Sequence, residues 1–214
     1  MNKLLVKDSN VSINNSYQNL EIKTSKLILN ISGSNTINDY DNNTDLDLKI
    51  IMEPHSKLLY NRKNANINNF TLDIEALSDS YIEFNYSLET SVASNIKLDA
   101  NISGNQNTSR VNFHGVTKDE GLIKSIATSK VSENTKDNEI LENLRIIALN
   151  DTENEIITNL LVRSDSVNAI HNTTISSIDK DYLFYLNSKG IDNETATKLI
   201  VDGFLKSVLK ENIK

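Results

Sequence analysis

The sequence predicts a mostly β body followed by a short α-helical region. From about residue 11 to about residue 170, apolar residues recur with a period of two, which is typical of strands with one buried face. Short polar clusters separate these strand-like segments at nearly regular intervals. Near residue 175 the period becomes helical. We therefore expect a β body over residues 1–174 and a two-helix region over residues 175–214.

The strand-like segments are centred near residues 48, 60, 72, 84, 98 and 112, about 12 to 14 residues apart. In each segment an apolar face alternates with a polar one, as in Leu46–Met52, Ile82–Leu88 and Ile96–Ile102. An antiparallel sandwich or barrel produces this rhythm, and so does a β-solenoid whose strands stack from coil to coil. The residues alone leave these two β architectures open.

Asparagine is unusually common, with roughly thirty residues, whereas glycine occurs six times and proline once. Asparagine tolerates left-handed backbone conformations and is favoured in turns. We therefore expect asparagine to supply much of the turn chemistry. The apolar content of 38% is low for a globular chain, which fits an elongated body that needs little interior per residue.

Two helices are expected after the β body. Asp179 is a suitable N-cap for a helix over residues 180–189, Gly190 stands where a C-terminal glycine belongs, and Asp192 can cap a second helix. The helical period predicts that the buried stripe of the second helix consists of Ala196, Leu199, Ile200, Gly203, Phe204 and Val208. The other apolar residues of this tail either pack on the β body or form a docking surface. If the body is a solenoid, we expect the tail to close one end and residues 1–20 the other.

Composition and charge exclude several classes of function. A net charge of −7 without any block of basic residues argues against nucleic-acid binding. The absence of cysteine excludes disulfides, thiolate metal sites and cysteine nucleophiles within this chain. No apolar run approaches the length of about 18 residues that a membrane span needs, and the N-terminal segment is charged too early for a signal peptide. We expect a cytoplasmic protein that binds neither nucleic acid nor membrane.

The second half of the chain carries several short motifs in a fixed order. Leu183–Ile191 reads LFYLNSKGI, and the pair Gly203-Phe204 lies in the helix that follows. Asp165–Thr174 reads DSVNAIHNTT, while Phe113–Gly115 and Leu149–Asp151 read FHG and LND. In order and spacing these motifs resemble the SufB/SufD family of iron–sulfur cluster assembly scaffold proteins. The resemblance is close over residues 144–210 and extends loosely back to about residue 67.

The resemblance implies a fold and a set of partners. Family members contain a right-handed parallel β-helix, which decides between the two β architectures. Their C-terminal helices bind SufC, an ATP-binding-cassette ATPase, and two SufB/SufD-type subunits pair through their β-helices. ATP binding by SufC strains the scaffold and exposes the site where the nascent cluster forms. Because this chain has no P-loop, the resemblance implies a subunit that is not an enzyme and leaves ATP hydrolysis to its partner.

By the same resemblance, the helical tail supplies the surface that binds a SufC-like ATPase. The residues expected to form this surface are Phe184, Tyr185, Leu186, Gly203, Phe204 and Leu205.

His171 aligns with the family histidine near the subunit interface, which in SufD-like members is implicated as a ligand of cluster iron. Neutral imidazole is a competent iron ligand, and a hydrogen-bonded structural histidine is the alternative role. Asn172 stands where SufB-like members have glutamate, and Ala169 stands where several SufD-like members have cysteine. Without a thiolate the chain cannot carry a persulfide.

The chain therefore resembles a shortened SufD-like subunit. Its expected partner is a cysteine-bearing SufB-like subunit or a second copy of itself. We expect no cofactor to be bound stably by this chain alone, and an iron–sulfur cluster to be present transiently in the complex.

The remaining candidates have plainer expected roles. We expect His114 to be an exposed or hydrogen-bonded strand residue and His55 to lie in a turn. Asp45, Asp47 and Asp99 point outward from strands, which predicts a solvated face rather than a catalytic pair of carboxylates. The alternative functions are a homodimeric reduced scaffold, a degenerate paralogue without cluster chemistry, and a carbohydrate-binding β-helix. The aromatic content of 6% and the absence of tryptophan weigh against the last.

Overall fold

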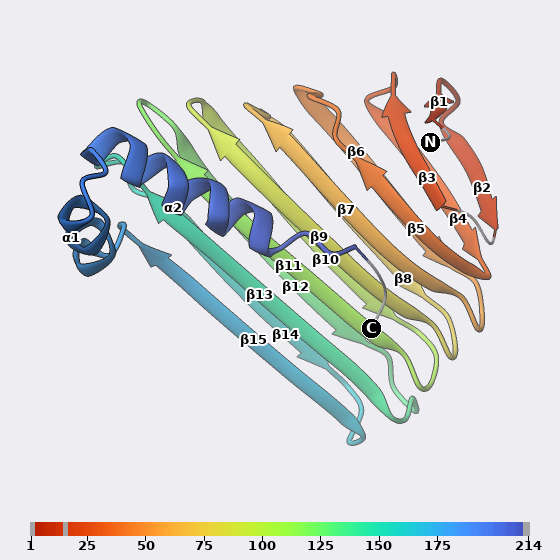
Figure 1. Ribbon diagram of the computed structural model, residues 1–214. Coiled ribbons are helices and arrows are strands. Elements are labelled where there is room, and N and C mark those ends of the chain that lie inside the picture. Colours follow the sequence, from red (N-terminus) through yellow and green to blue (C-terminus); the bar gives the residue numbers. More distant parts are fainter. Residues whose placement is uncertain (1–2, 15–16, 212–214) are drawn as a thin grey trace.

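The computed structural model describes residues 3–14 and 17–211 and shows a two-layered parallel β-solenoid with a helical tail (Figure 1). The chain alternates between an eight-stranded and a seven-stranded sheet, so each coil contributes one strand to each sheet. All strand pairs are parallel and join strands two apart in the sequence, as β9 pairs with β7 and β11. The prediction of a parallel β-helix is confirmed, and the sandwich is excluded.

The strands of the two sheets lengthen along the chain. The eight-stranded sheet contains β1 (Lys3–Val6), β3 (Tyr17–Ile22), β5 (Ser34–Asp39), β7 (Lys57–Ala65), β9 (Tyr81–Thr90), β11 (Thr108–Thr117), β13 (Asn138–Ala148) and β15 (Val167–Ser176). The seven-stranded sheet contains β2 (Asn10–Asn14), β4 (Lys26–Ser32), β6 (Asp45–Met52), β8 (Asn69–Ala76), β10 (Ala93–Ile102), β12 (Leu122–Val131) and β14 (Glu155–Val162).

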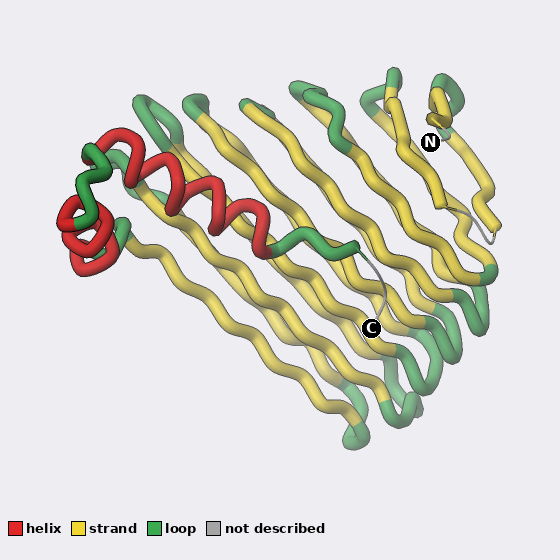
Figure 2. Tube along the Cα trace, viewed as in Figure 1, coloured by secondary structure: helices red, strands yellow, loops and turns green. Residues whose placement is uncertain are grey.

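The length of one coil grows along the chain. Lys3 pairs with Asn19, so the first coil repeats after 16 residues, whereas Thr108 pairs with Glu139, so a later coil repeats after 31. The solenoid is therefore wider at its C-terminal end, and the turns line up along its two edges (Figure 2). Because the repeat length changes, the sequence has no fixed period that a search for repeats could detect.

The core lies between the two sheets and is built from the inward half of each alternating strand. In β6 the inward residues Leu46, Leu48, Ile50 and Met52 are buried, as the alternation predicts. Aromatic rings stack along the interior, with ring centroids 5.0 Å apart between Tyr60 and Phe84.

One ion pair is enclosed within this core. The Arg62 guanidinium donates to the carboxylate of Asp39, both side chains are fully buried, and the hydroxyl of Tyr60 also donates to Asp39. Arg62 and Asp39 are register partners on neighbouring coils. The pair therefore neutralises two charges within the stack, with the ring of Phe70 4.8 Å from the guanidinium carbon.

Asparagine residues form a ladder across the outer face of the eight-stranded sheet, and hydrogen bonds link its rungs from Asn112 back to Asn19. Each rung lies in register with the next, in the order Asn19, Asn38, Asn61, Asn85, Asn112, Asn143 and Asn172. The amide of Asn112 donates to Asn85 at 2.9 Å, Asn85 donates to Asn61 at 3.2 Å, and Asn61 donates to Asn38 at 3.0 Å. The amides of Asn85 and Asn61 each donate to one rung and accept from the other, which fixes the register between coils.

The ladder changes the explanation of the asparagine surplus. Among the described residues, seven positions other than glycine have a left-handed backbone, and only two of them are asparagine. These positions are His55, Asn66, Asp79, Gln106, Asp119, Asn134 and Asp137. Asparagine supplies turn chemistry mainly through its side chains: Asn107 accepts from the backbone N–H of Ser80 at 3.0 Å, and Asn150 donates to the carbonyl oxygens of Asp119 and Gly121 at 2.8 Å. At the left-handed positions aspartate is the more frequent residue.

The helical tail begins close to the expected boundary. β15 ends at Ser176, and α1 spans Lys180–Ser188 with Asp179 as N-cap; α2 spans Asn193–Ser207 with Asp192 as N-cap. Gly190 has a φ of 83°, the left-handed conformation expected after a helix end. Residues 1–2 and 15–16 of the expected β body and residues 212–214 of the expected tail lie outside the described residues.

The buried stripe of α2 differs from the prediction. Ala196, Val201, Leu205 and Val208 are buried, whereas Leu199 is 51% exposed. Val201 and Leu205 pack against Val116 of β11, so α2 lies across the outer face of the eight-stranded sheet (Figure 1). That face is partly polar, and the helix therefore turns a different side toward it than the strongest apolar repeat predicts.

The tail does not close the end of the solenoid, contrary to the expectation. α2 contacts β9 and β11, which are internal strands, while β14 and β15 form the terminal coil. At the other end β1 and β2 form the first coil; the expected closure by residues 1–20 falls partly on residues outside those described.

Asn85 provides a test of the ladder. We expect Asn85→Ala to lower the free energy of unfolding by about 1–3 kcal/mol, because the buried amide of Asn61 and the half-buried amide of Asn112 lose a partner. Urea unfolding measures the change. Asn168→Ala is the control, since Asn168 is exposed on β15, and it should stay within about 0.5 kcal/mol of the unaltered protein. Equal effects of the two substitutions would contradict the structural role of the ladder.

Candidate functional site

The C-terminal end of the solenoid is open. β15 and β14 are the last strands of their sheets, so each has one edge without a strand partner among the described residues. Inward apolar side chains that another coil would cover remain accessible at this end, including Ile175 at 45% and Val162 at 39% exposure. We refer to β14 and β15 together as the open end.

His171 lies in the middle of β15 at the open end and is exposed. Its register partner on the previous coil is Glu142 of β13. Glu142 belongs to the inward series of β13, together with the buried residues Ile140 and Leu144. The imidazole therefore belongs to the inward series of the last coil, where no further coil covers it.

Glu142 is a carboxyl group buried directly behind this histidine. Glu142 is 1% exposed, and its Oε1 accepts a hydrogen bond of 2.5 Å from the hydroxyl of Ser129 on the opposite sheet. Its Oε2 is buried without a hydrogen-bond partner. Burial raises the pKa of Glu142 above its usual value, while the Ser129 hydrogen bond and the charge of His171 lower it and Asp99 raises it.

His171 and Glu142 together present an imidazole and a carboxyl oxygen, both of which are donors that iron accepts. The sequence analysis identified His171 but missed Glu142. The alternation of apolar and polar residues in β13 could have revealed it, because Glu142 occupies an inward position between Ile140 and Leu144. A charged residue in the inward phase of a buried strand points to a special role.

The second candidate surface is α1. None of its residues is buried, and the side chains of Tyr182, Phe184 and Tyr185 are 65%, 76% and 59% exposed. Leu186 is half-buried. The structure therefore places Phe184, Tyr185 and Leu186 of the expected partner-binding set on an accessible helix, which packs mainly against α2.

The other three residues of that set lie on α2 in different surroundings. Gly203 is exposed, and a side chain added there would meet open space. Phe204 is half-buried and Leu205 is buried, and both pack against the β-sheet. Phe204 and Leu205 are thus less exposed than Phe184, which is 76% exposed on α1.

His114 attaches α2 to the sheet. Its Nδ1 donates a 2.8 Å hydrogen bond to the carbonyl oxygen of Phe204, and its ring stacks on the Phe204 ring with centroids 4.3 Å apart. Burial lowers the pKa of His114 from its usual value; the hydrogen bond to Phe204 raises it, and the positive charges of Arg145 and Lys210 lower it further. His114 is hydrogen-bonded, as expected, but it is buried rather than exposed.

The remaining candidates occupy surface positions. The side chain of His55 is 79% exposed in a left-handed turn and lies 3.4 Å from the carboxylate of Asp79. Asp45 and Asp47 are exposed on β6, and Asp99 is half-buried beside Lys97 at 2.9 Å. These placements agree with a charged outer face.

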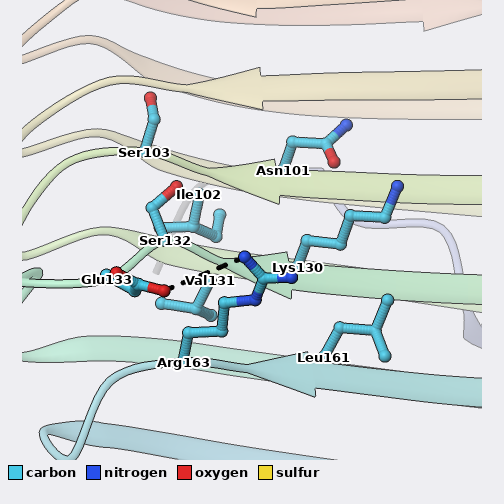
Figure 3. Close-up of a pocket in the computed structure, with 9 residues that line it drawn as sticks. All are labelled: Asn101, Ile102, Ser103, Lys130, Val131, Ser132, Glu133, Leu161 and Arg163. Atoms are coloured by element: carbon cyan, nitrogen blue, oxygen red, sulfur yellow. Dashed lines mark ion pairs between the residues drawn. The ribbon is translucent and has the colours of Figure 1, made fainter.

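A groove of about 720 Å³ lies where β10, β12 and β14 end (Figure 3). Lys130, Glu133, Leu161 and Arg163 contribute to its lining, and Arg163 reaches Glu133 at 3.9 Å with both side chains mostly exposed. Neither His171 nor Glu142 lines this groove, and the open end remains the candidate site.

Among residues 3–14 and 17–211, no three side chains of histidine, aspartate or glutamate are grouped so that they could hold a metal ion. Neither α1 nor α2 has the length and apolar character that crossing a membrane requires.

Comparison with known proteins identifies similar sequences. Residues 54–204 match the family model described as the SufBD core domain of SUF system FeS cluster assembly. The chain is 29% identical over 99 residues to the iron–sulfur cluster assembly protein SufD of Bacillus subtilis, covering 46% of this chain and 23% of that protein. It is 35% identical over 66 residues to an iron–sulfur cluster assembly SufBD family protein of Staphylococcus saprophyticus, covering 31% of this chain and 14% of that protein. The match thus spans less than a quarter of the length of either relative.

The buried position of His114 predicts that docking of α2 depends on pH. Because the folded-state pKa lies below the usual 6.5, the detached state binds the proton more readily. The stabilisation is therefore fully present above about pH 6.5 and is lost as pH falls through the lowered pKa. Amide hydrogen exchange, corrected for intrinsic rates, should show several-fold weaker protection of α2 at pH 5 than at pH 7.5. His114→Asn keeps a donor but cannot titrate, and it should remove this difference; an unchanged pH dependence in that variant would refute the assignment.

Proposed function

Because the chain belongs to the SufBD family of SUF-type iron–sulfur cluster assembly proteins, we propose that it is a non-catalytic scaffold subunit of such an assembly complex. The open end would pair with a second β-helix subunit, either a SufB-like protein or another copy of this chain. α1 would bind a SufC-like ATP-binding-cassette ATPase. The observation that carries this proposal is the exposed His171 above the buried Glu142, on a terminal coil with two free strand edges.

Pairing at the open end is supported by the chemistry of strand edges. A free edge presents unpaired N–H and C=O groups, which readily pair with another strand. Val167 and Ala169 are only half-buried, although they pack on buried residues of the previous coil. A second subunit would complete their burial and would enclose His171 at the junction.

The nascent cluster would be the cargo of this junction. His171 would contribute an imidazole nitrogen to iron, with the Glu142 carboxyl group directly behind it. The chain has no cysteine, so sulfide or persulfide sulfur would come from a partner that carries a thiolate. We therefore expect the isolated chain to be colourless and to hold no stoichiometric iron.

α1 supports the proposed contact with the ATPase. Three aromatic side chains on this short helix, those of Tyr182, Phe184 and Tyr185, are each more than half exposed and are available to a partner. The neighbouring helix, α2, is held on the solenoid by the hydrogen bond from His114 and by its own apolar contacts with the sheet. The tail thus combines an anchored helix with an accessible one.

Phe184 tests the ATPase contact. We expect Phe184→Asp to reduce co-purification of a SufC-like ATPase at least tenfold, because it replaces the most exposed aromatic side chain of α1 with a charge. The β-sheet circular dichroism should not change, since Phe184 is 76% exposed.

Ile126→Asp is the matched control. Ile126 is also exposed, at 42%, but it lies on the seven-stranded sheet away from the tail, so this variant should retain the ATPase. Capture of the ATPase by the Phe184 variant at the affinity of the unaltered protein would show that α1 is not the docking surface.

His171 tests the cargo site. In a reconstituted complex with a cysteine-bearing SufB-like subunit and the ATPase, we expect His171→Ala to reduce cluster formation more than tenfold, because it removes an iron ligand. Visible absorption and iron content measure the cluster. Folding should be unaffected, since His171 is exposed.

His55→Ala serves as the control, because His55 lies in an exposed turn, and it should leave cluster formation unchanged. His114→Ala is unsuitable as a control because His114 holds α2 on the sheet. Unimpaired cluster formation by the His171 variant would show that His171 is not an iron ligand and that the chain contributes only structure to the complex.

A further inference from the structure

We infer that a groove on the outer face of the eight-stranded sheet, between the C-terminal end of α2 and strands β11 and β13, binds a small organic oxyanion. The ligand carries a phosphate or carboxylate group and bridges the helical tail and the sheet. This inference goes beyond the proposed scaffold function, because the groove includes neither the open end nor α1.

The groove has a volume of about 380 Å³, which is within the usual range for small-molecule sites. Its floor consists of outward side chains of β9, β11 and β13, and the end of α2 with the residue Lys210 forms its wall. Three pairs of register partners on β11 and β13 belong to the floor: Arg110 with Leu141, Asn112 with Asn143, and His114 with Arg145.

The charge of this groove is opposite to that of the whole chain. The protein has a net charge of −7, yet Arg110, Arg145 and Lys210 all line the groove. Glu83 is the one carboxylate among the lining residues that the structure describes. It is 7% exposed and accepts a 3.0 Å hydrogen bond from the hydroxyl of Tyr81. The lining therefore has an excess of positive charge, which attracts an anion.

Two of the three cations are available to a ligand. Arg110 is paired with Glu139 at 3.0 Å. By contrast, neither Arg145 nor Lys210 forms an ion pair within residues 3–14 and 17–211, and both are exposed. An anion in the groove would supply the partner that these two side chains lack.

Arg145 is positioned by an aromatic ring. Its guanidinium carbon lies 5.5 Å from the centroid of the Phe204 ring, which also stacks on the imidazole of His114. A guanidinium that is already held against a ring loses less conformational freedom when it binds a ligand. Its planar set of donors matches two oxygens of one phosphate or carboxylate group.

Asn143 provides an uncharged donor on the floor of the groove. The hydrogen-bonded part of the ladder stops at Asn112, whose amide donates to Asn85 at 2.9 Å. Asn143 is half-buried, and its side chain makes no hydrogen bond with any described residue. It lies two residues before Arg145 on β13 and therefore on the same face of the sheet. The amide and the guanidinium can bind the same anion.

The lining also has an apolar part. Val208 of the tail is 4% exposed, and Leu141 of β13 is half-buried. These aliphatic side chains can contact the carbon portion of a ligand, while the cations and the amide contact its oxyanion. This combination favours an organic phosphate or carboxylate over a simple inorganic ion.

The bound anion would strengthen the attachment of the tail. Arg145 belongs to the sheet, whereas Lys210 follows α2. The positive charges of both residues lower the pKa of His114, so both cations lie near the same imidazole. Like charges on the two sides of this contact repel each other, and an anion between them replaces the repulsion with attraction. A ligand that binds only the docked tail stabilises docking by mass action.

Isothermal titration calorimetry of the full chain, with inorganic phosphate and with malonate as probes, tests the site. Neutral pH and constant ionic strength separate specific binding from general screening of charge. We expect saturable binding of at least one probe. Tighter binding of phosphate would assign a phosphate ligand, and tighter binding of malonate would assign a carboxylate ligand. Absence of saturable binding by both probes would overturn the inference.

Arg145→Gln should weaken binding of the probe at least tenfold, because it removes a charged bidentate donor. Arg163→Gln is the matched control: it removes the same charge from an exposed side chain in the groove where β10, β12 and β14 end, and it should leave the affinity unchanged. Equal affinity of the Arg145 variant and the unaltered protein would indicate an adventitious ion only.

Lys210 gives a second test, because the Arg145 substitution also removes a contact with Phe204. We expect Lys210→Gln to weaken binding several-fold by removing one of the cations. Lys206→Gln is its control, since Lys206 is also exposed but lines a different groove, one turn earlier on α2. Binding that is insensitive to Lys210→Gln would exclude the tail from the site and overturn the inference.

Amide hydrogen exchange measures the bridge between tail and sheet. Saturation with the anion should raise the protection of α2 several-fold in the unaltered protein but not in the Arg145→Gln variant. Unchanged protection despite saturable binding would overturn the bridging role. None of these measurements includes an ATPase or a second scaffold subunit, so their failure is distinguishable from failure of the proposed function.

Discussion

Each coil of this protein can bury its inward side chains only against the coils before and after it. Parallel pairing keeps inward residues stacked on inward residues, from Leu46 and Phe70 in the second sheet to Ile140 and Ala169 in the first. An internal coil satisfies the constraint on both sides, but the coil of β14 and β15 satisfies it on one side only. The open end is a direct consequence of stacking, and the tail does not compensate for it because α2 lies across internal strands.

Several polar groups in this stack are paired with groups on a neighbouring coil. Asp39 and Arg62 neutralise each other from adjacent coils, and the amides of Asn61 and Asn85 bond to the rung on either side. Glu142 has one buried carboxyl oxygen without a hydrogen-bond partner, as the hydroxyl of Tyr86 also lacks one, and its register neighbour is the exposed His171. The Glu142 oxygen is distinguished by its position beside the open end, where a ligand or a second subunit could supply the missing hydrogen bond.

Part of this architecture could be predicted from the sequence because it depends on local rules. Alternation located the strands of the middle coils, and the two aspartate N-caps with Gly190 placed both helices. The parallel arrangement came from the resemblance to a family, since alternation does not distinguish a solenoid from a sandwich. The ladder could not be predicted, because its rungs are 19, 23, 24, 27, 31 and 29 residues apart and share no period. The orientation of α2 depends on a partly polar sheet face, and Glu142 gains its significance only from the coil that follows it.

The connection between the two candidate surfaces is short. Only residues 177–179 separate the end of β15 from the start of α1, so the edge strand of the open end and the exposed aromatic helix are neighbours in the chain. α2 then returns over the sheet, and the backbone of Lys210 exchanges hydrogen bonds with Asn61, a rung of the ladder. The tail is therefore fixed at both ends of its path, to β15 at one end and to an internal coil at the other. A force applied to α1 would act on the open end through three residues, while the anchored α2 resists displacement of the remaining tail.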